Sequence, residues 1–267
     1  MKTYYYVHTG HRIGLDRFRR AVAILNALDE DITLLTSDYR IAQVSHDFGI
    51  ENSVGLDVVR NIPQIANNGD RLIFDSDEAN PIMLEDMKQY FSTFIQIKND
   101  TIAVENKFLD AKSQEKSVHI SYFFGDDDYE KDLEKNLDFL AGLEVHLQLG
   151  FYYFLDYEDM LKKQFKNYFE FEEYDEMIQK TDILISCSPQ AILDSLASGG
   201  RPVYVQREDY VTDFNEKFQE LNVPIIYNFD AQKLEEILKT IDTFCYTYEG
   251  IHEQKIIDFI KGNLILH

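Results

Sequence analysis

A cluster of arginines directly follows the first apolar run of this sequence. Residues 10–20 (GHRIGLDRFRR) hold four of the nine arginines of the chain. An apolar run at 4–7 precedes them and apolar residues at helical spacing follow from 18 to 28, which predicts a strand, a glycine loop and a helix. A glycine loop before a helix start is a natural anion site. We therefore expect Gly14 and Arg20 to contact phosphate, although a tight turn with solvated arginines has the same local pattern.

Side chains that could move a proton or hold a metal lie at two predicted strand ends. His8 and His11 stand three residues apart in the first loop, where this spacing indicates no zinc site, and His11 is the stronger candidate for a general base. Asp75 ends the predicted strand 71–75 and Asp77 follows it, and paired carboxylates can hold Mg²⁺. Because the chain has 48 acidic residues, we interpret this pair as strand-end acids facing water and expect no metal.

A second candidate site lies in the apolar stretch 182–205. A buried strand is predicted to end in small hydroxyl residues at Ser186 and Ser188, and a helix is predicted to begin at Pro189. Small residues at such a junction let a ligand approach the backbone, and a helix N-terminus can bind phosphate. Asp194 lies one turn further along the helix, where an acid can accept a hydrogen bond from a ribose hydroxyl.

Strand and helix patterns alternate along the whole chain, which predicts parallel sheets with helices on both faces. The predicted strands are 4–7, 31–37, 53–56, 71–75, 94–97, 118–124, 144–151, a strand from 182, 203–205 and 223–227. The predicted helices are 18–28, 39–48, 58–67, 81–90, one from the turn at 125–128 to about 140, 156–168 with a loop, 172–181, one from 189, 212–221, 231–244 and 250–264. Ligands bind beyond the carboxyl ends of parallel strands, where the arginine loop and Asp75 fall.

A polar, non-periodic stretch at 107–117 is the best candidate for a linker. It predicts two α/β domains, an N-terminal domain of residues 1–112 on the sugar and acceptor side and a C-terminal nucleotide-binding domain of residues 113–267. The last helix of the second domain is expected to be able to pack back on the first.

The composition excludes several classes of partner. A formal net charge of −22 opposes general binding to nucleic acid or to anionic membranes, because both need a basic surface. The two cysteines, Cys187 and Cys245, have no metal or redox spacing, and we expect them to be reduced. With no signal-peptide pattern and no apolar stretch that could span a bilayer, we expect a cytoplasmic protein without stable membrane insertion.

Three places in the second half resemble the C-terminal domain of GT-B glycosyltransferases. Residues 124–127 (FGDD) stand at a Gly-Gly-x-x loop, and residues 186–202 stand at a serine- or glycine-rich turn followed by a helix with Glu, whose place Asp194 takes. Asn215 stands at the start of an Asn-led helix. More narrowly, the chain is similar to the lipid II-forming N-acetylglucosaminyltransferase and to the UDP-sugar hydrolase of pseudaminic acid biosynthesis.

The first half is similar to the Gly-x-Gly-His-x-x-Arg loop of that hydrolase. Gly14 and Arg20 match the motif, Asp16 replaces the second glycine, and Arg17 replaces the histidine. The resemblance implies two Rossmann-like domains in a GT-B arrangement, with a nucleotide-sugar as substrate in the interdomain cleft and no further cofactor.

The resemblance implies a role for each candidate residue. Those expected around the base, phosphates and ribose are Gly125, Ser188, Gln190, Asp194 and Asn215. Those expected to offset negative charge on the leaving group or sugar are Arg12, Arg17 and Arg20. The candidate general bases are His11, Asp16 and Asp75. The implied reaction is an inverting, metal-independent transfer.

Three other functions stay open at this point. The chain length favours a hydrolase, which transfers the sugar to water, whereas Arg17 at the histidine position favours transfer to an acceptor. The high negative charge and the altered motifs fit a GT-B-derived binding or regulatory protein without catalysis. A dinucleotide-dependent oxidoreductase fits poorly, because no Gly-x-Gly-x-x-Gly follows a strand.

Overall fold

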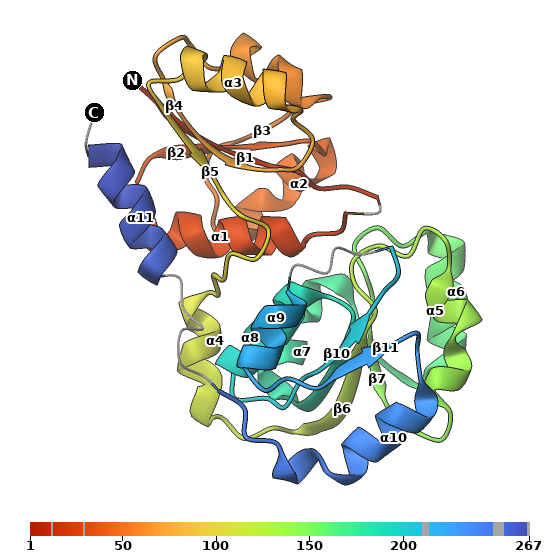
Figure 1. Cartoon of the computed structure of the whole chain (residues 1–267). Coiled ribbons are helices and arrows are strands. Elements are labelled where there is room, and N and C mark those ends of the chain that lie inside the picture. Colours follow the sequence, from red (N-terminus) through yellow and green to blue (C-terminus); the bar gives the residue numbers. More distant parts are fainter. Residues whose placement is uncertain (12, 29, 210–213, 248–253, 266–267) are drawn as a thin grey trace. The chain divides into compact units, whose positions relative to one another are not determined.

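The chain consists of two compact units, which are described here separately (Figure 1). The structure is a computed structural model that describes residues 1–11, 13–28, 30–209, 214–247 and 254–265. The first unit comprises residues 1–13, 17–105 and 252–267, and the second comprises residues 14–16 and 106–251. Arg12 and the expected helix starts at 212 and 250 lie outside the described residues.

The first unit is built on a sheet of five parallel strands. In chain order these are β1 (Thr3–Val7), β2 (Ile32–Thr36), β3 (Ser53–Gly55), β4 (Arg71–Asp75) and β5 (Thr93–Gln96). The order across the sheet is β3-β2-β1-β4-β5, so β1 pairs with both β2 and β4. Every residue of β1 is buried, because the central strand is covered on both faces.

Helices lie on both faces of this sheet (Figure 1). They are α1 (Asp16–Leu28), α2 (Tyr39–Val44), α3 (Pro81–Tyr90) and α11 (Gln254–Ile265), with 3₁₀ segments η1 (Ser45–Phe48) and η2 (Val59–Gln64). Asn80 accepts a hydrogen bond from Met83 N and Pro81 occupies the first turn, which together fix the start of α3. On the α3 face, Tyr6 and Phe74 stack with ring centroids 5.4 Å apart.

The second unit contains a sheet of six parallel strands. They are β6 (Val118–Phe123), β7 (His146–Gln148), β8 (Asn167–Phe169), β9 (Thr181–Ser186), β10 (Val203–Gln206) and β11 (Ile225–Tyr227). Their order across the sheet is β11-β10-β9-β6-β7-β8. The predicted fold class, parallel sheets with helices on both faces, is therefore confirmed in both units.

The helices of the second unit also cover both faces of their sheet. They are α4 (Asn106–Asp110), α5 (Asp132–Lys135), α6 (Leu155–Gln164), α7 (Tyr174–Lys180), α8 (Pro189–Ala197), α9 (Asn215–Glu220) and α10 (Ala231–Lys239), with η3 (Ala111–Ser113), η4 (Leu137–Leu140), η5 (Phe171–Glu173) and η6 (Ile241–Thr243). Leu161 of α6 and Leu234 of α10 join the core on one face. Phe123 contacts Tyr174 of α7 on the other.

Each sheet has one point at which the strand order reverses. In the first unit this point lies between β1 and β4, and in the second it lies between β6 and β9. Two chain connections leave in opposite directions there, and in parallel α/β sheets ligands bind at such a point, beyond the carboxyl ends of the two strands, which we call the crevice of each unit. Residues just after β1, β4, β6 and β9 are therefore the ones that the fold places for binding.

Some predicted elements differ from those observed. Residues 58–67 form only the 3₁₀ segment η2, because Pro63 inside it lacks an N–H and disfavours a regular α-helix. The helix predicted up to about residue 140 is broken into α5 and η4, and Lys131 before it has a φ of +56°. The strand β8 was not predicted, because the charged and aromatic segment 156–168 is expected to form a helix and a loop.

The polar stretch 107–117 is part of the second unit. It contains most of α4 and all of η3, and Phe108 in it is buried against Tyr174, with ring centroids 6.4 Å apart. The boundary between the two compact units lies between Glu105 and Asn106. The helix α11 belongs to the first unit, where Arg71 Nη1 donates to Leu264 O at 3.2 Å.

Among the described residues, no helix combines the length and the apolar character that crossing a bilayer requires.

Candidate functional site

A cluster of charged side chains occupies the crevice between β1 and β4 of the first unit. His8 directly follows β1, and Asp77 and Glu78 follow β4. Arg17 comes from the first turn of α1, and Asn99 comes from the segment after β5. Four segments that are distant in sequence meet here because β1 and β4 are neighbours in the sheet.

Arg17 holds Asp77 in a fixed position. Its two terminal nitrogens donate to the two carboxylate oxygens of Asp77, each at 2.9 Å, and Nη2 also donates to Asn99 Oδ1 at 3.3 Å. The Arg17 side chain is 12% exposed and that of Asp77 is 47% exposed. A bidentate pair of this geometry orients a carboxylate more strictly than a single contact does.

Asp77 in turn orients the imidazole of His8. His8 Nδ1 lies 3.3 Å from Asp77 Oδ1, and Nε2 lies 3.7 Å from Glu78 Oε1. An ionised carboxylate can only accept, so His8 Nδ1 donates to Asp77. Hydrogen bonds from His8 and from Arg17 hold the pKa of Asp77 well below its usual range. Asp77 therefore orients the imidazole of His8, whose Nε2 lies on the side of Glu78.

We expect the stabilising effect of Asp77 to disappear in acid. Because the folded-state pKa of Asp77 is lowered, its contribution is present above its unfolded pKa of about 3.9 and is lost as the pH falls toward the lower folded value. Urea unfolding should show that Asp77→Asn costs at most about 1 kcal/mol near pH 7, since the carboxylate is half exposed. A cost that grows on acidification would contradict this assignment.

Beneath this cluster, Arg20 and Asp75 form a buried ion pair. Arg20 Nε donates to Asp75 Oδ2 at 3.0 Å, and Nη2 donates to Oδ1 at 2.5 Å. The hydroxyl of Tyr5 also donates to Asp75 Oδ2 at 3.0 Å, and Arg20 Nη1 donates to the carbonyl of Asn99 at 2.6 Å. Burial, and then the charge of Asp75, raise the pKa of Tyr5 well above its usual range. Arg20 and Asp75 thus lie in the interior of the unit and pack beneath the charged cluster.

The crevice of the second unit lies beside the start of α8. Ser186 Oγ at the end of β9 donates to Phe123 O at 2.8 Å and accepts from Ser188 N at 3.0 Å. Ser188 Oγ accepts from Ala191 N at 3.1 Å and so caps the helix, with Pro189 in its first turn. The sequence prediction of a small-residue junction that leads into a helix is confirmed.

Gln190 and Asp194 lie one turn apart on this helix and contact each other. Gln190 Nε2 donates to Asp194 Oδ1 at 2.8 Å, and the hydroxyl of Tyr174 donates to Asp194 Oδ2 at 2.8 Å. Asp194 is only 1% exposed. Its carboxylate is thus buried and accepts a hydrogen bond on each oxygen, from Gln190 and from Tyr174.

Gly125 follows β6 on the other side of this crevice. Its φ of +123° is one that residues with a side chain rarely adopt, so the turn requires glycine. The turn is held by Arg207, which follows β10. Arg207 Nη1 donates to Asp127 O at 2.9 Å and to Phe124 O at 3.4 Å, and its guanidinium carbon lies 4.2 Å from the Phe124 ring centroid. Asp209 pairs with the other nitrogens of Arg207 at 2.6 and 2.9 Å.

The remaining predicted site residues are placed as follows. Gly14 and Asp16 group with the second unit, in which Asp16 accepts from Ser188 Oγ at 2.6 Å and from Gln190 N at 3.4 Å. His11 is exposed. Asn215 is the first residue of α9, and its Oδ1 is buried without a hydrogen-bond partner. No group of three or more His, Cys, Asp or Glu that could hold a metal occurs among the described residues.

Solved structures share this fold. MurG from Acinetobacter baumannii is 12% identical, with a TM-score of 0.55 over 98% of this chain and 100% of that chain. The UDP-GlcNAc 2-epimerase of Methanocaldococcus jannaschii, in complex with UDP-GlcNAc and UDP, is 10% identical, with a TM-score of 0.58 over 98% and 99%. A glycosyltransferase from Rickettsia africae is 11% identical, with a TM-score of 0.55 over 98% and 93%.

The chain has the two Rossmann-like sheets of the GT-B fold. At these identities the similarity shows the GT-B fold alone. No protein-family model matches the sequence, and no curated protein matches it. The functional assignment therefore depends on the two crevices of this GT-B chain.

The interpretation of Asp75 and Asp77 as strand-end acids facing water is wrong for Asp75, which is fully buried and paired with Arg20, whereas the side chain of Asp77 is 47% exposed. The contact between His8 and Asp77 is not expected from the sequence, in which His11 is the stronger candidate for a general base. The positions of His8 and Asp77 could have indicated this contact, because the two residues follow strands that are neighbours in a Rossmann-like sheet. Arg207 was not singled out, because nothing in the sequence ties it to Gly125, more than 80 residues earlier.

The two cysteines should differ sharply in reactivity. Cys187 lies fully buried between Ser186 and Ser188, and burial raises the pKa of its thiol to about 12. Cys245 is exposed. Because the thiolate is the reactive form, we expect a disulfide reagent at neutral pH to label Cys245 in the folded protein and Cys187 only after unfolding. Rapid labelling of both thiols in the folded chain would contradict the buried position of Cys187.

Proposed function

We propose that this protein is a glycosyltransferase-like enzyme that binds a nucleotide-sugar and transfers its glycosyl group to an acceptor hydroxyl. The second unit would bind the nucleotide, and the first unit would supply the acid–base chemistry. The observation that carries the proposal is the crevice between β6 and β9, where a glycine turn and a capped helix start flank the same point of strand reversal.

The chemistry of this crevice supports nucleotide binding. The N-terminus of α8, with its small residues and its backbone N–H groups, would receive the phosphates. Gly125 would let a phosphate or ribose approach the backbone closely. Asp194, oriented by Gln190 and Tyr174, would accept a hydrogen bond from a ribose hydroxyl after one of these contacts is exchanged. The solved structure with UDP-GlcNAc and UDP has the same fold and supports this ligand class.

The crevice of the first unit supports proton transfer. We propose that His8 Nε2 takes the proton of the acceptor hydroxyl as its oxygen forms a bond to the anomeric carbon. The bond from that carbon to the phosphate oxygen breaks, and the nucleotide leaves with the electron pair. Asp77 and Arg17 are positioning residues in this scheme, since they fix the ring of His8. Arg20 and Asp75 support the crevice from below.

Product analysis tests the proposal and separates its two variants. The chain would be incubated with UDP-sugars and CMP-sugars, with and without candidate sugar acceptors. We expect release of nucleotide that depends on the acceptor and appears together with a glycosylated product. Acceptor-independent release of free sugar would instead assign hydrolysis. Nucleotide binding without any turnover would indicate a GT-B-derived binding protein and would contradict catalysis.

A further inference from the structure

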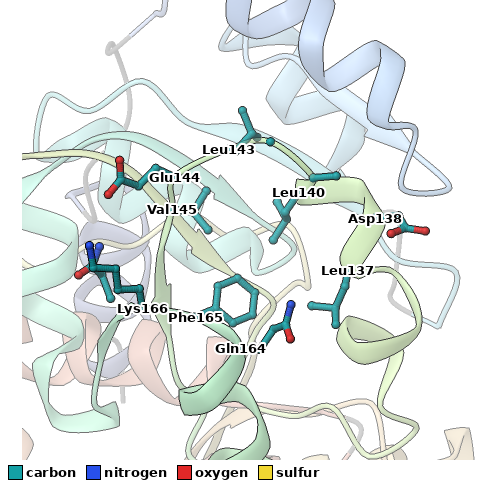
Figure 2. Close-up of a pocket in the computed structure, with 12 residues that line it drawn as sticks. Leu137, Asp138, Leu140, Leu143, Glu144, Val145, Gln164, Phe165 and Lys166 are labelled. Atoms are coloured by element: carbon teal, nitrogen blue, oxygen red, sulfur yellow. The ribbon is translucent and has the colours of Figure 1, made fainter.

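A pocket of about 550 Å³ opens in the second unit at the edge of the sheet opposite Gly125 and Ser188. Its lining comes from two segments, 137–145 and 164–167 (Figure 2). These segments immediately precede the parallel strands β7 and β8, so the pocket lies at the amino ends of the strands. The nucleotide crevice lies at the carboxyl ends, and the two sites are therefore distinct.

The floor of this pocket is apolar. Leu140, Val145 and Phe165 are each 9% exposed or less, and Leu137 and Leu143 add partly buried side chains. Figure 2 shows the ring of Phe165 turned toward the centre of the pocket. The volume lies within the range of about 300–1,000 Å³ that is typical of small-molecule sites. Such a floor favours an aliphatic or aromatic group.

Glu144 and Lys166 carry opposite charges at the mouth of the pocket and do not form an ion pair with each other. The β7–β8 register pairs His146 with Asn167, which brings Glu144 and Lys166 to neighbouring positions at the entrances of the two strands. Both side chains lie on the same side of the pocket in Figure 2. Within the part of the chain that the structure describes, neither makes a hydrogen bond or an ion pair through its side chain, although Lys162 one turn earlier pairs with Glu170 at 2.8 Å.

This combination of floor and mouth selects a zwitterion. A purely anionic ligand would meet Glu144, as well as Asp138 across the mouth, and a purely cationic ligand would meet Lys166. A free amino acid carries an ammonium and a carboxylate on one carbon, and its side chain projects away from both. We propose that this pocket binds a hydrophobic α-amino acid, with its carboxylate on Lys166, its ammonium on Glu144 and its side chain over Val145 and Phe165. This site does not depend on the proposed glycosyl transfer.

A series of three ligands tests the charge requirement on the full chain. L-Phenylalanine carries both charges, phenethylamine carries only the ammonium, and 3-phenylpropanoate carries only the carboxylate. Titration calorimetry should show saturable binding of phenylalanine about tenfold tighter than of either analogue, because each analogue loses one charge-assisted contact. Equal affinities for the three compounds, or no saturable binding of phenylalanine, would overturn the proposal.

A pair of lysine variants tests the location. Lys166→Gln should weaken phenylalanine to about the affinity of phenethylamine and leave phenethylamine no weaker. Lys163→Gln removes the same charge three residues earlier, in the last turn of α6, but residue 163 does not line the pocket, so binding should stay unchanged. Amide hydrogen exchange with phenylalanine should show protection at 140–145 and 164–167. Equal effects of the two variants, or protection confined to residues 124–128, would contradict the site.

Discussion

Replacing His8 with alanine should lower kcat for glycosyl transfer by about 10²- to 10⁴-fold and leave nucleotide affinity unchanged. That range is typical for the loss of a general base. His8 is the one histidine that the structure places at the reversal point of the first sheet among the described residues, with Nδ1 on Asp77 and Nε2 toward Glu78. Its substitution removes the proposed proton acceptor and leaves the proposed nucleotide site of the second unit intact.

Two further variants calibrate this result. His11→Ala is the matched control, since His11 is exposed in the same loop and should affect kcat by less than about twofold. Asp77→Asn should lower kcat by less than the loss of His8 does and should leave KM nearly constant, because an amide can present the wrong atom to Nδ1. If His8→Ala and His11→Ala were equally active, His8 would not be the base.

The largest effect on stability is expected at Arg20. Its substitution by alanine leaves the carboxylate of Asp75, which is fully buried, without its cation. Removing one partner of a buried ion pair typically costs about 3–5 kcal/mol, because the remaining charge keeps its desolvation penalty. Tyr5 still donates to Asp75, but one neutral hydroxyl does not replace a bidentate guanidinium. Urea unfolding followed by circular dichroism would measure the loss.

Arg40 provides the control for this experiment. It pairs with Asp38 in the same unit at 2.9 Å, but its side chain is 52% exposed. Exposed pairs contribute about 0–1 kcal/mol, so Arg40→Ala should be nearly neutral. Similar losses for Arg20→Ala and Arg40→Ala would show that the interior pair does not stabilise the first unit as described.

The fold is predictable because strand and helix patterns alternate along the chain. The prediction fails where a short segment lacks a strand pattern of its own. The central strands β1, β4, β6 and β9 each hold five or six residues in apolar runs, which is long enough to show a strand pattern. The edge strand β8 holds three residues and its sequence, NYF, resembles a loop. Its strand conformation depends on pairing with β7, a contact that no local pattern records.

The site was less predictable, because its contacts depend on the order of strands in the sheet. The helix start at Ser188 is local, and Pro189 and the small residues around it indicate it directly. The contact between His8 and Asp77 joins residues 69 positions apart and exists because β1 pairs with β4. The pairing of Arg20 with Asp75 also depends on this strand order. The local sequence predicts Arg20 as a phosphate ligand, whereas its side chain binds Asp75.

A thermal-shift titration tests directly whether the second unit binds a nucleotide. The chain would be heated with UDP, GDP, CMP and their sugars, beside Asp194→Asn and the exposed control Asp175→Asn on α7. We expect one nucleotide to raise Tm in a saturable way, since a ligand at 100 times its Kd stabilises by about 2.7 kcal/mol. The shift should be reduced in Asp194→Asn and retained in Asp175→Asn. No shift with any nucleotide would contradict nucleotide binding by the second unit.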